Sequence, residues 1–204
     1  MEYGITFSVA ATNGASRRLT VSIEITGPFT ENILELRFPR WVPGSYFIRE
    51  PIQHMSELSA KIDGKSSKIS RVDVDGAKVS GVKGAKLVSI NYRLLAAEMT
   101  CRANHLDSTH VHIMPPYTWM LPTRGIDKNR IEMDHKVTLD APSDWHTATQ
   151  LNGVEGEWVA EGRDEFLDAI MESNPNPMIT FEVEGTNQHL KLWDSGGLPI
   201  PQEG

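Results

Sequence analysis

The stretch Ile5-Thr6-Phe7-Ser8-Val9, followed by Leu19-Thr20-Val21-Ser22-Ile23-Glu24-Ile25, decides the class of fold. Apolar side chains occupy every second position in both runs, so each run has one apolar face when its backbone is extended. Between the runs, Asn13-Gly14 is a favoured pair for a tight hairpin turn because both residues tolerate a positive φ. The N-terminal region therefore predicts an antiparallel β-hairpin.

The same period of two continues along the chain, and Asp-Gly pairs at 63–64 and 75–76 separate successive runs. This pattern predicts a mainly all-β fold, an antiparallel two-sheet sandwich-like domain. We expect this domain to cover residues 1–194, with a linker or tail at 195–204 whose glycines and prolines disfavour regular structure. Further strands are expected at 58–62, 69–74, 78–82, 87–94, 110–114, 131–139, 145–150, 157–160, 178–184 and 189–193.

One segment has helical spacing instead. Apolar residues at 166, 167, 170 and 171 predict a short helix over 164–172. Asp164 is the expected N-cap, and Pro175 and Pro177 are expected to end the helix.

Composition excludes several classes of function. The net charge of −7 disfavours binding to nucleic acid or to an anionic membrane, since both require cationic patches. The sequence has no signal-peptide pattern and no apolar run near the ~20 residues of a membrane span, so a cytoplasmic location is expected. Cys101 is the only cysteine, which excludes an internal disulfide, and its extended surroundings predict a buried, inert thiol.

Catalytic motifs are missing from the sequence. It contains no H-E-x-x-H zinc motif, no phosphate-binding G-x-x-x-x-G-K and no dinucleotide-binding G-x-G-x-x-G. Ser45 follows Gly44, but the flanking Pro43 and Tyr46 break the nucleophile-elbow pattern. We therefore expect no catalytic residue in this chain.

The histidine-rich segment 105–112 is the best candidate for a site. His110 and His112 are two residues apart, so on a strand both imidazoles point to one face. With Asp107 or His105 nearby, three ligands for a divalent metal ion are conceivable. The alternative is a polar strand face whose histidines bind backbone or water. We expect no metal here, although a small metalloenzyme built on these histidines is an alternative function.

Residues 114–122 form a strip rich in proline, methionine and aromatic residues. If exposed, the strip would be an interaction patch, and the chain could then be a free-standing interaction module. If it folds inward, the strip is part of the core.

A proline- and aromatic-rich signature follows the run at 33–38. Its prolines fix φ on either side of a large aromatic ring, and Pro43-Gly44 is typical of a turn. Two interpretations are open: a rigid corner that packs Trp41 and Tyr46, or a recognition segment that presents Tyr46 and Arg49. The signature residues are Pro39, Trp41, Pro43, Gly44, Tyr46 and Arg49.

This signature resembles the P-x-W-x-P-G-S-Y-x-x-R element of the glycyl-aminopeptidase-type zinc metallopeptidases, the peptidase family sixty-one. Other segments resemble the family's motifs in the same order along nearly the whole chain. They are the runs at 90–94 and 102–107, P-x-x-W-x-x-A-T-x-L at 142–151, the helix segment at 165–168, and 181–192 near the end.

The resemblance implies the N-terminal β-domain of an aminopeptidase, often one with a C-terminal PDZ domain. Zinc and the catalytic residues would then belong to a catalytic domain absent from this chain, which would be its partner. The β-domain would pack on that domain and contact peptide substrate only indirectly, at the border of the substrate cleft. The expected cleft residues are Asp107, His110, His112 and Asp168.

Overall fold

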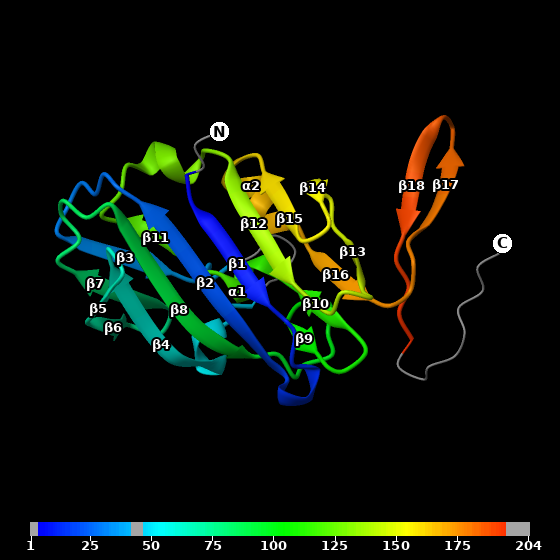
Figure 1. Ribbon diagram of the computed structural model, residues 1–204, viewed down its shortest axis with the longest axis horizontal. Helices are drawn as coiled ribbons and strands as arrows, with labels where there is room; N and C mark the ends of the chain where they lie inside the picture. The colour runs from blue at the N-terminus through cyan, green and yellow to red at the C-terminus, as the bar shows by residue number, and fades with distance from the viewer. Residues whose placement is uncertain (1–3, 42–46, 195–204) are drawn as a thin grey trace.

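The main layer of the fold is an eight-stranded sheet with the order β14-β15-β12-β1-β2-β8-β4-β5 (Figure 1). A computed structural model shows this arrangement and describes residues 4–41 and 47–194. Neighbouring strands in this sheet are antiparallel, except that β1 and β12 are parallel. The strands are β1 (Thr6–Ala10), β2 (Arg18–Thr26), β4 (Met55–Ile62), β5 (Lys65–Ser67), β8 (Leu87–Leu95), β12 (His135–Asp140), β14 (Asn152–Val154) and β15 (Glu157–Ala160).

Two four-stranded antiparallel sheets form the second layer, behind the large sheet in Figure 1. One contains β13 (His146–Ala148), β16 (Met171–Asn174), β10 (Val111–Ile113) and β9 (His105–Leu106). The other contains β11 (Leu121–Arg124), β3 (Ile33–Arg37), β7 (Gly76–Ser80) and β6 (Ile69–Val72). The predicted mainly-β, antiparallel, sandwich-like class is confirmed.

A row of apolar side chains across the large sheet shows why its register is well defined. Phe7 lies opposite Ile23 on one side and Val137 on the other. Ile23 in turn lies opposite Ile90, and Val137 opposite Trp158. All five side chains are buried. A slip of one residue in any strand would turn its apolar set toward water, so burial of this face specifies the pairing.

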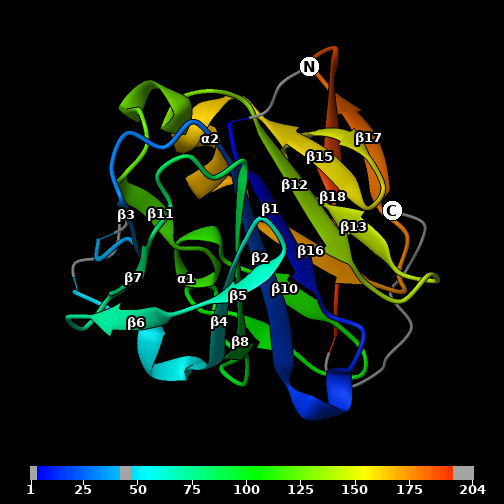
Figure 2. The same ribbon diagram turned by 60° about the vertical axis from the view of Figure 1, so that its left-hand side comes forward.

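Helices α1 (Pro115–Thr118) and α2 (Gly162–Asp168) pack against the inner face of the large sheet (Figure 2). Phe166 of α2 stacks on Phe7 with ring centres 4.1 Å apart, and Trp119 lies edge-on to Phe7. The strip at 114–122 therefore folds inward, with Trp119 and Met120 fully buried. Its burial removes the surface that the free-standing interaction module would have used.

The helix prediction is wrong at both ends. Helix α2 begins at Gly162, with Glu161 rather than Asp164 as its N-cap, and it ends at Asp168. Residues Met171–Asn174, assigned in part to the predicted helix, form β16. The prolines at 175 and 177 thus follow a strand, not a helix.

Other boundaries also differ from prediction. Asn13-Gly14 does not form a tight turn, because Gly14–Ser16 is a 3-10 helix (η1) and Arg17 has a φ of 49°. The region expected as one strand over 131–139 begins instead with the end of η3 (Lys128–Ile131), and β12 starts at His135. Cys101 is exposed in a turn, so the expectation of a buried thiol is wrong.

Strands β17 (Ile179–Val183) and β18 (Thr186–Leu190) form a separate two-stranded hairpin. It projects from the rest of the molecule (Figure 1), and its side chains are largely exposed. The predicted strand at 189–193 is thus shifted toward the chain's N-terminus. Within residues 4–41 and 47–194, no helix is long and apolar enough to cross a membrane.

Candidate functional site

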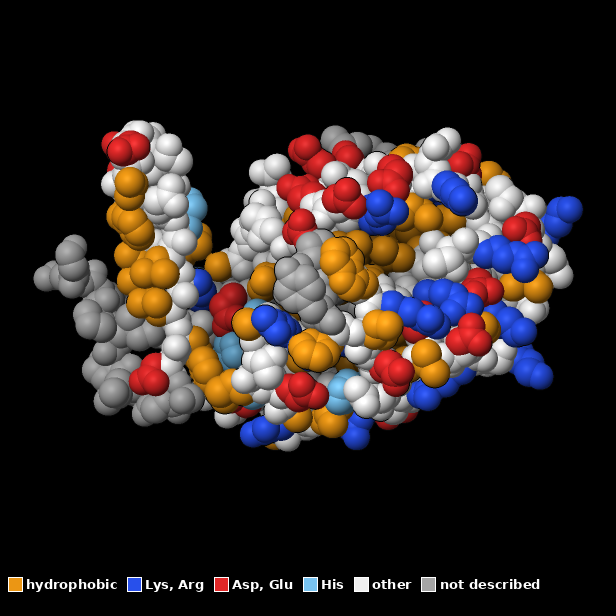
Figure 3. Space-filling model, turned by 180° about the vertical axis from the view of Figure 1, so that it is seen from behind, with side chains coloured by type: hydrophobic (Ala, Val, Ile, Leu, Met, Phe, Trp, Pro, Cys, Tyr) orange, Lys and Arg blue, Asp and Glu red, His pale blue; other side chains and the backbone are white. Residues whose placement is uncertain are grey.

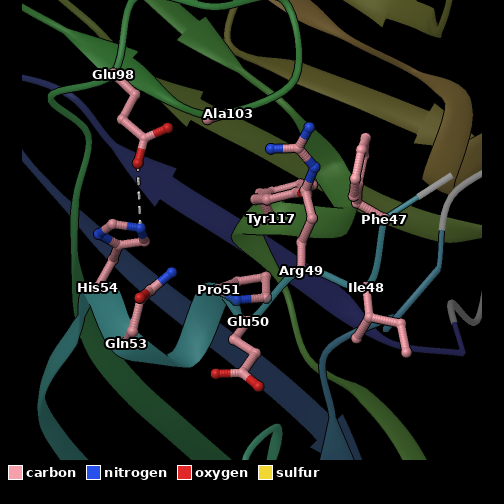
Figure 4. Close-up of a pocket in the computed structure, with 10 residues that line it drawn as sticks. All are labelled: Phe47, Ile48, Arg49, Glu50, Pro51, Gln53, His54, Glu98, Ala103 and Tyr117. Carbon is pink, nitrogen blue, oxygen red and sulfur yellow. Dashed lines mark ion pairs between the residues drawn. The ribbon is translucent and has the colours of Figure 1, made fainter. Parts of the chain in front are cut away.

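A hollow of about 350 Å³ lies beside η2 (Pro51–His54) and α1, next to the signature segment (Figure 4). At one end, His54 Nε2 lies 3.4 Å from a carboxylate oxygen of Glu98. At another, the Arg49 guanidinium carbon lies 6.0 Å from the centre of the Tyr117 ring, within cation–π range. The remaining lining residues are Phe47, Ile48, Glu50, Pro51, Gln53 and Ala103.

Only part of the proline- and aromatic-rich signature lies among the residues that the structure describes. Pro43, Gly44 and Tyr46 lie outside the described residues. Trp41 is 59% exposed, so the interpretation in which the signature corner packs both aromatic rings is wrong for Trp41. Arg49 lines the hollow.

The second candidate is a row of polar side chains across β9, β10 and β16. His112 lies directly opposite His105 on β9 and opposite Glu172 on β16. Residues paired in this way present their side chains to the same face of a sheet. His110 precedes β10 by one residue, and its backbone carbonyl accepts a 3.0 Å hydrogen bond from Asp107 N. The topology thus brings residues from distant parts of the chain together; we call His105, Asp107, His110, His112 and Glu172 the histidine–carboxylate cluster.

Each imidazole in this cluster contacts a carboxylate. His110 Nε2 lies 2.6 Å from Glu172 Oε1, and His112 Nδ1 lies 2.9 Å from Glu172 Oε2. Glu172 therefore confirms that His110 and His112 point to one face, because the two oxygens of a single carboxylate serve both rings. His105 Nε2 lies 3.2 Å from Asp107 Oδ2.

The two carboxylates are held ionised. Burial alone would raise the pKa of Glu172, but hydrogen bonds from His110 and His112 outweigh it and lower this pKa. Burial likewise opposes ionisation of Asp107, and its pKa is lowered by hydrogen bonds from the Thr109 backbone and hydroxyl and by His105. The cluster consequently places two negative charges beside three imidazoles.

The structure brings only some of the predicted site residues together. Asp107, His110 and His112 come together, whereas Asp168 lies exposed at the end of α2 and takes no part in the cluster. Sequence reasoning missed Glu172 because residue 172 was assigned to the helix. It also missed Trp193, whose ring stacks on His110 with ring centres 4.1 Å apart and whose Nε1 donates to Thr109 Oγ1.

Comparison with solved structures shows where this architecture recurs. An aminopeptidase N family protein from Idiomarina loihiensis superposes with a TM-score of 0.80 at 20% identity, covering 91% of this chain and 32% of that one. An M1 zinc metallopeptidase from Deinococcus radiodurans, solved with a Tyr-Ser-Ala substrate, matches at a TM-score of 0.52 and 9% identity over 97% of this chain and 49% of that one. Yeast LTA4 hydrolase in complex with bestatin matches at 0.52 and 9%, over 87% and 29%.

The fold is thus one that occurs within several larger peptidases, and this chain spans about a third of the length of the Idiomarina protein. A family model for the Peptidase M61 N-terminal domain matches residues 6–171. The chain belongs to this family. A comparison with curated protein sequences gave no match.

Proposed function

We propose that this chain is the non-catalytic N-terminal module of a zinc aminopeptidase-like protease and that it packs on the catalytic domain of that protein. The observation that carries the proposal is the family match over 6–171, together with the 32% share of the Idiomarina aminopeptidase N family protein that the chain covers. Zinc and the residues that bind it would lie in the catalytic domain.

An exposed apolar surface supports this role. Trp41, Phe47 and Ile48 are 59%, 69% and 74% exposed, and Phe47 and Ile48 border the hollow of Figure 4. Large apolar side chains that gather on a surface mark contact sites for other protein. Figure 3 shows hydrophobic side chains gathered near the middle of the face opposite to that of Figure 1. We infer that the surface of Phe47 and Ile48 meets the catalytic domain.

We further propose that this domain forms one border of the substrate cleft. Clefts between domains are common ligand sites, and the histidine–carboxylate cluster offers polar groups for a peptide. We propose Asp107, His110 and His112 as cleft residues, and Asp168 as a separate candidate. In the full-length protein, Asp107→Asn and Asp168→Asn are expected to raise KM more than they lower the melting temperature. Unchanged kinetics with a lowered melting temperature would make these residues structural.

The packing proposal is tested first by reading the gene beyond Gly204, where an encoded H-E-x-x-H is expected. In the full-length protein, the double variant Phe47→Ser/Ile48→Ser should loosen the interface. We expect faster proteolysis between the two domains and a lower kcat/KM. The matched control is Val154→Ser, since Val154 is similarly exposed, at 72%, on edge strand β14. Equal behaviour of the double variant and the control would contradict the proposed contact surface.

A further inference from the structure

Each of the three imidazoles in the histidine–carboxylate cluster has one ring nitrogen left over. The other nitrogen contacts Asp107 in His105 and Glu172 in His110 and His112. The remaining nitrogens are His105 Nδ1, His110 Nδ1 and His112 Nε2, which are buried and have no hydrogen-bond partner among the residues that the structure describes. His105 and His110 are only 2% and 5% exposed. Buried polar atoms are nearly always paired, so such a group of unpaired nitrogens indicates a missing partner.

An imidazole with one nitrogen on a carboxylate and the other free is the arrangement found in metal-binding histidines. The carboxylate fixes the orientation of the ring and makes the free nitrogen a better ligand. Here Glu172 makes that contact for His110 and for His112, from the neighbouring strand β16.

The spacing of the possible ligand atoms also fits a metal ion. One donor atom from each of His105, Asp107 and His110 lies within 4.8 Å of the others. His105 Nε2 and Asp107 Oδ2 are 3.2 Å apart. In a tetrahedral zinc site with bonds of about 2.0–2.1 Å, ligand atoms lie about 3.3 Å from each other. His105 Nε2 and Asp107 Oδ2 thus stand close to this separation, so in His105 the ligand would be Nε2 and not the unpaired Nδ1. His110, whose Nε2 contacts Glu172, would supply its free Nδ1 as the third ligand.

We propose that His105, Asp107 and His110 bind one divalent transition-metal ion of the zinc class, with Glu172 as a positioning residue for His110. Two imidazoles and a carboxylate are ligands that suit zinc better than calcium or magnesium. A hollow of about 230 Å³ reaches the cluster and is lined by Met99, Thr100, Cys101, His105, His110 and His112. It provides an entry path and room for water as a fourth ligand. Asp107 and His110 are also proposed above as cleft residues, but zinc binding by residues 1–204 does not depend on packing against a catalytic domain.

The proposal is tested on the chain of residues 1–204 without a polyhistidine tag, after removal of metals by a chelator. Titration with ZnCl₂ in a calorimeter is expected to show one ion per chain. Replacement by Co²⁺ should give the visible absorption bands of a tetrahedral site. His110→Gln and Asp107→Asn should each weaken zinc binding by more than about 100-fold, and Glu172→Gln by about 10- to 100-fold.

The control variant is His146→Gln. His146 lies on β13 of the same sheet but is exposed, so its loss should leave the zinc affinity unchanged. Asparagine at 107 retains an oxygen that can accept the hydrogen bonds from Thr109, which protects the turn. Circular dichroism establishes that each variant is folded. Substoichiometric zinc and no cobalt bands in the unaltered chain would overturn the proposal, as would equal affinities in His110→Gln and His146→Gln.

Discussion

Tyr92, which is buried, and Tyr117 of α1, which is half-buried, differ in what their hydroxyl groups contact. Tyr92 Oη donates a 2.8 Å hydrogen bond to the Thr118 carbonyl and accepts a 3.3 Å bond from Met120 N. Burial raises the pKa of Tyr92, so its hydroxyl stays protonated and able to donate. Tyr117 Oη is buried too, but it has no hydrogen-bond partner in the described part of the chain. The same chemical group is therefore structural in one residue and unsatisfied in the other.

Removing these two hydroxyls should affect stability differently. Tyr92→Phe leaves a buried carbonyl and a buried amide unpaired, so the free energy of unfolding should fall by about 1–3 kcal/mol. Tyr117→Phe removes an unpaired polar atom and should be neutral or slightly stabilising. Urea denaturation of both variants measures the difference. An equal loss in both variants would contradict the idea that the two hydrogen bonds of Tyr92 make the difference.

At the turn between β6 and β7, Asp75 forms ion pairs with two arginines. Its carboxylate is almost fully buried and pairs with Arg37 Nη1 at 2.7 Å and with Arg40 Nε. The hydrogen bond from Arg40 is the main cause that lowers the pKa of Asp75; burial opposes it, and the charges of both arginines add to the lowering. Asp73 also contacts Arg37, at 3.1 Å, but is 62% exposed.

The burial of Asp75 and the exposure of Asp73 predict how the free energy of unfolding depends on pH. Because the pKa of Asp75 is lower in the folded chain than in the unfolded chain, its stabilisation is complete above about pH 4 and is lost as the pH falls through the folded value. Asp75→Asn should reduce the free energy of unfolding at pH 7 by about 1–3 kcal/mol, and this difference should shrink in acid. Asp73→Asn should cost less than about 1 kcal/mol. A difference for Asp75→Asn that does not change between pH 7 and pH 3 would contradict the assignment.

Residue-level prediction succeeded where it depended on spacing alone. Two histidines separated by one residue must share a face of a strand, and Glu172 contacts both of them. The carboxylate partner could not be predicted, because Glu172 is opposite His112 only through strand pairing across 60 residues of sequence. Trp193 was missed for the same reason, since no local pattern places its ring on His110.

At the scale of elements, helix α2 is attached to the large sheet by one side chain above all. Phe166 is 1% exposed and contacts the rings of Phe7, Trp119 and His135. Burial also lowers the pKa of His135, whose Nε2 hydrogen-bonds the Ile131 carbonyl at 2.8 Å, so a neutral ring packs in this group. The aromatic group holds α2 against β1 and β12.

Truncation of Phe166 should therefore be severe. Phe166→Ala is expected to lower the free energy of unfolding by about 3–5 kcal/mol, through lost burial and the cavity left behind. Phe181→Ala, at an exposed position of β17, should change it by less than about 0.5 kcal/mol. Thermal and urea denaturation measure both. Similar losses in the two variants would show that α2 does not depend on this aromatic contact.

The boundary of α2 shows what a periodic pattern leaves undecided. The apolar pairs at 166–167 and 170–171 fit helical spacing, but Ala169 and Met171 are buried while Ile170 faces solvent. That alternation belongs to the approach to β16, where Met171 and Ser173 point inward. Because Ile170 is apolar although it is exposed, the change from helical to strand spacing is not visible in the sequence. The sequence therefore indicated a helix here but not the residue at which it ends.

At the scale of the whole molecule, the hydrophobic core and the projecting hairpin of β17 and β18 are separate parts. The buried apolar residues lie between the large sheet and the second layer, whereas the side chains of β17 and β18 contribute none to this core. Figure 3 shows a hydrophobic stripe along the projecting hairpin, where Phe181, Val183 and Leu190 are exposed. We therefore expect the hairpin to contribute little to the free energy of unfolding of the sandwich.

Replacing residues 179–190 by a short Gly-Ser linker should leave the free energy of unfolding within about 1 kcal/mol of the original value. The linker can close the gap because Ile179 and Leu190 are paired neighbours. Ile23→Ala, in the buried row of the large sheet, should in contrast cost about 2–5 kcal/mol. Urea denaturation compares the two proteins, and a large loss on removing the hairpin would show that it belongs to the cooperative unit.

The parallel pairing of β1 with β12 has a consequence for biosynthesis. Strands β1, β2, β4 and β8 can all associate once Leu95 has left the ribosome, but the free edge of β1 must wait for His135–Asp140. During that interval the nascent chain exposes a row of unsatisfied amides and carbonyls in the middle of its future main sheet. Open edges of this kind attract other strands, so slow translation between residues 95 and 135 would favour aggregation over completion of the sheet.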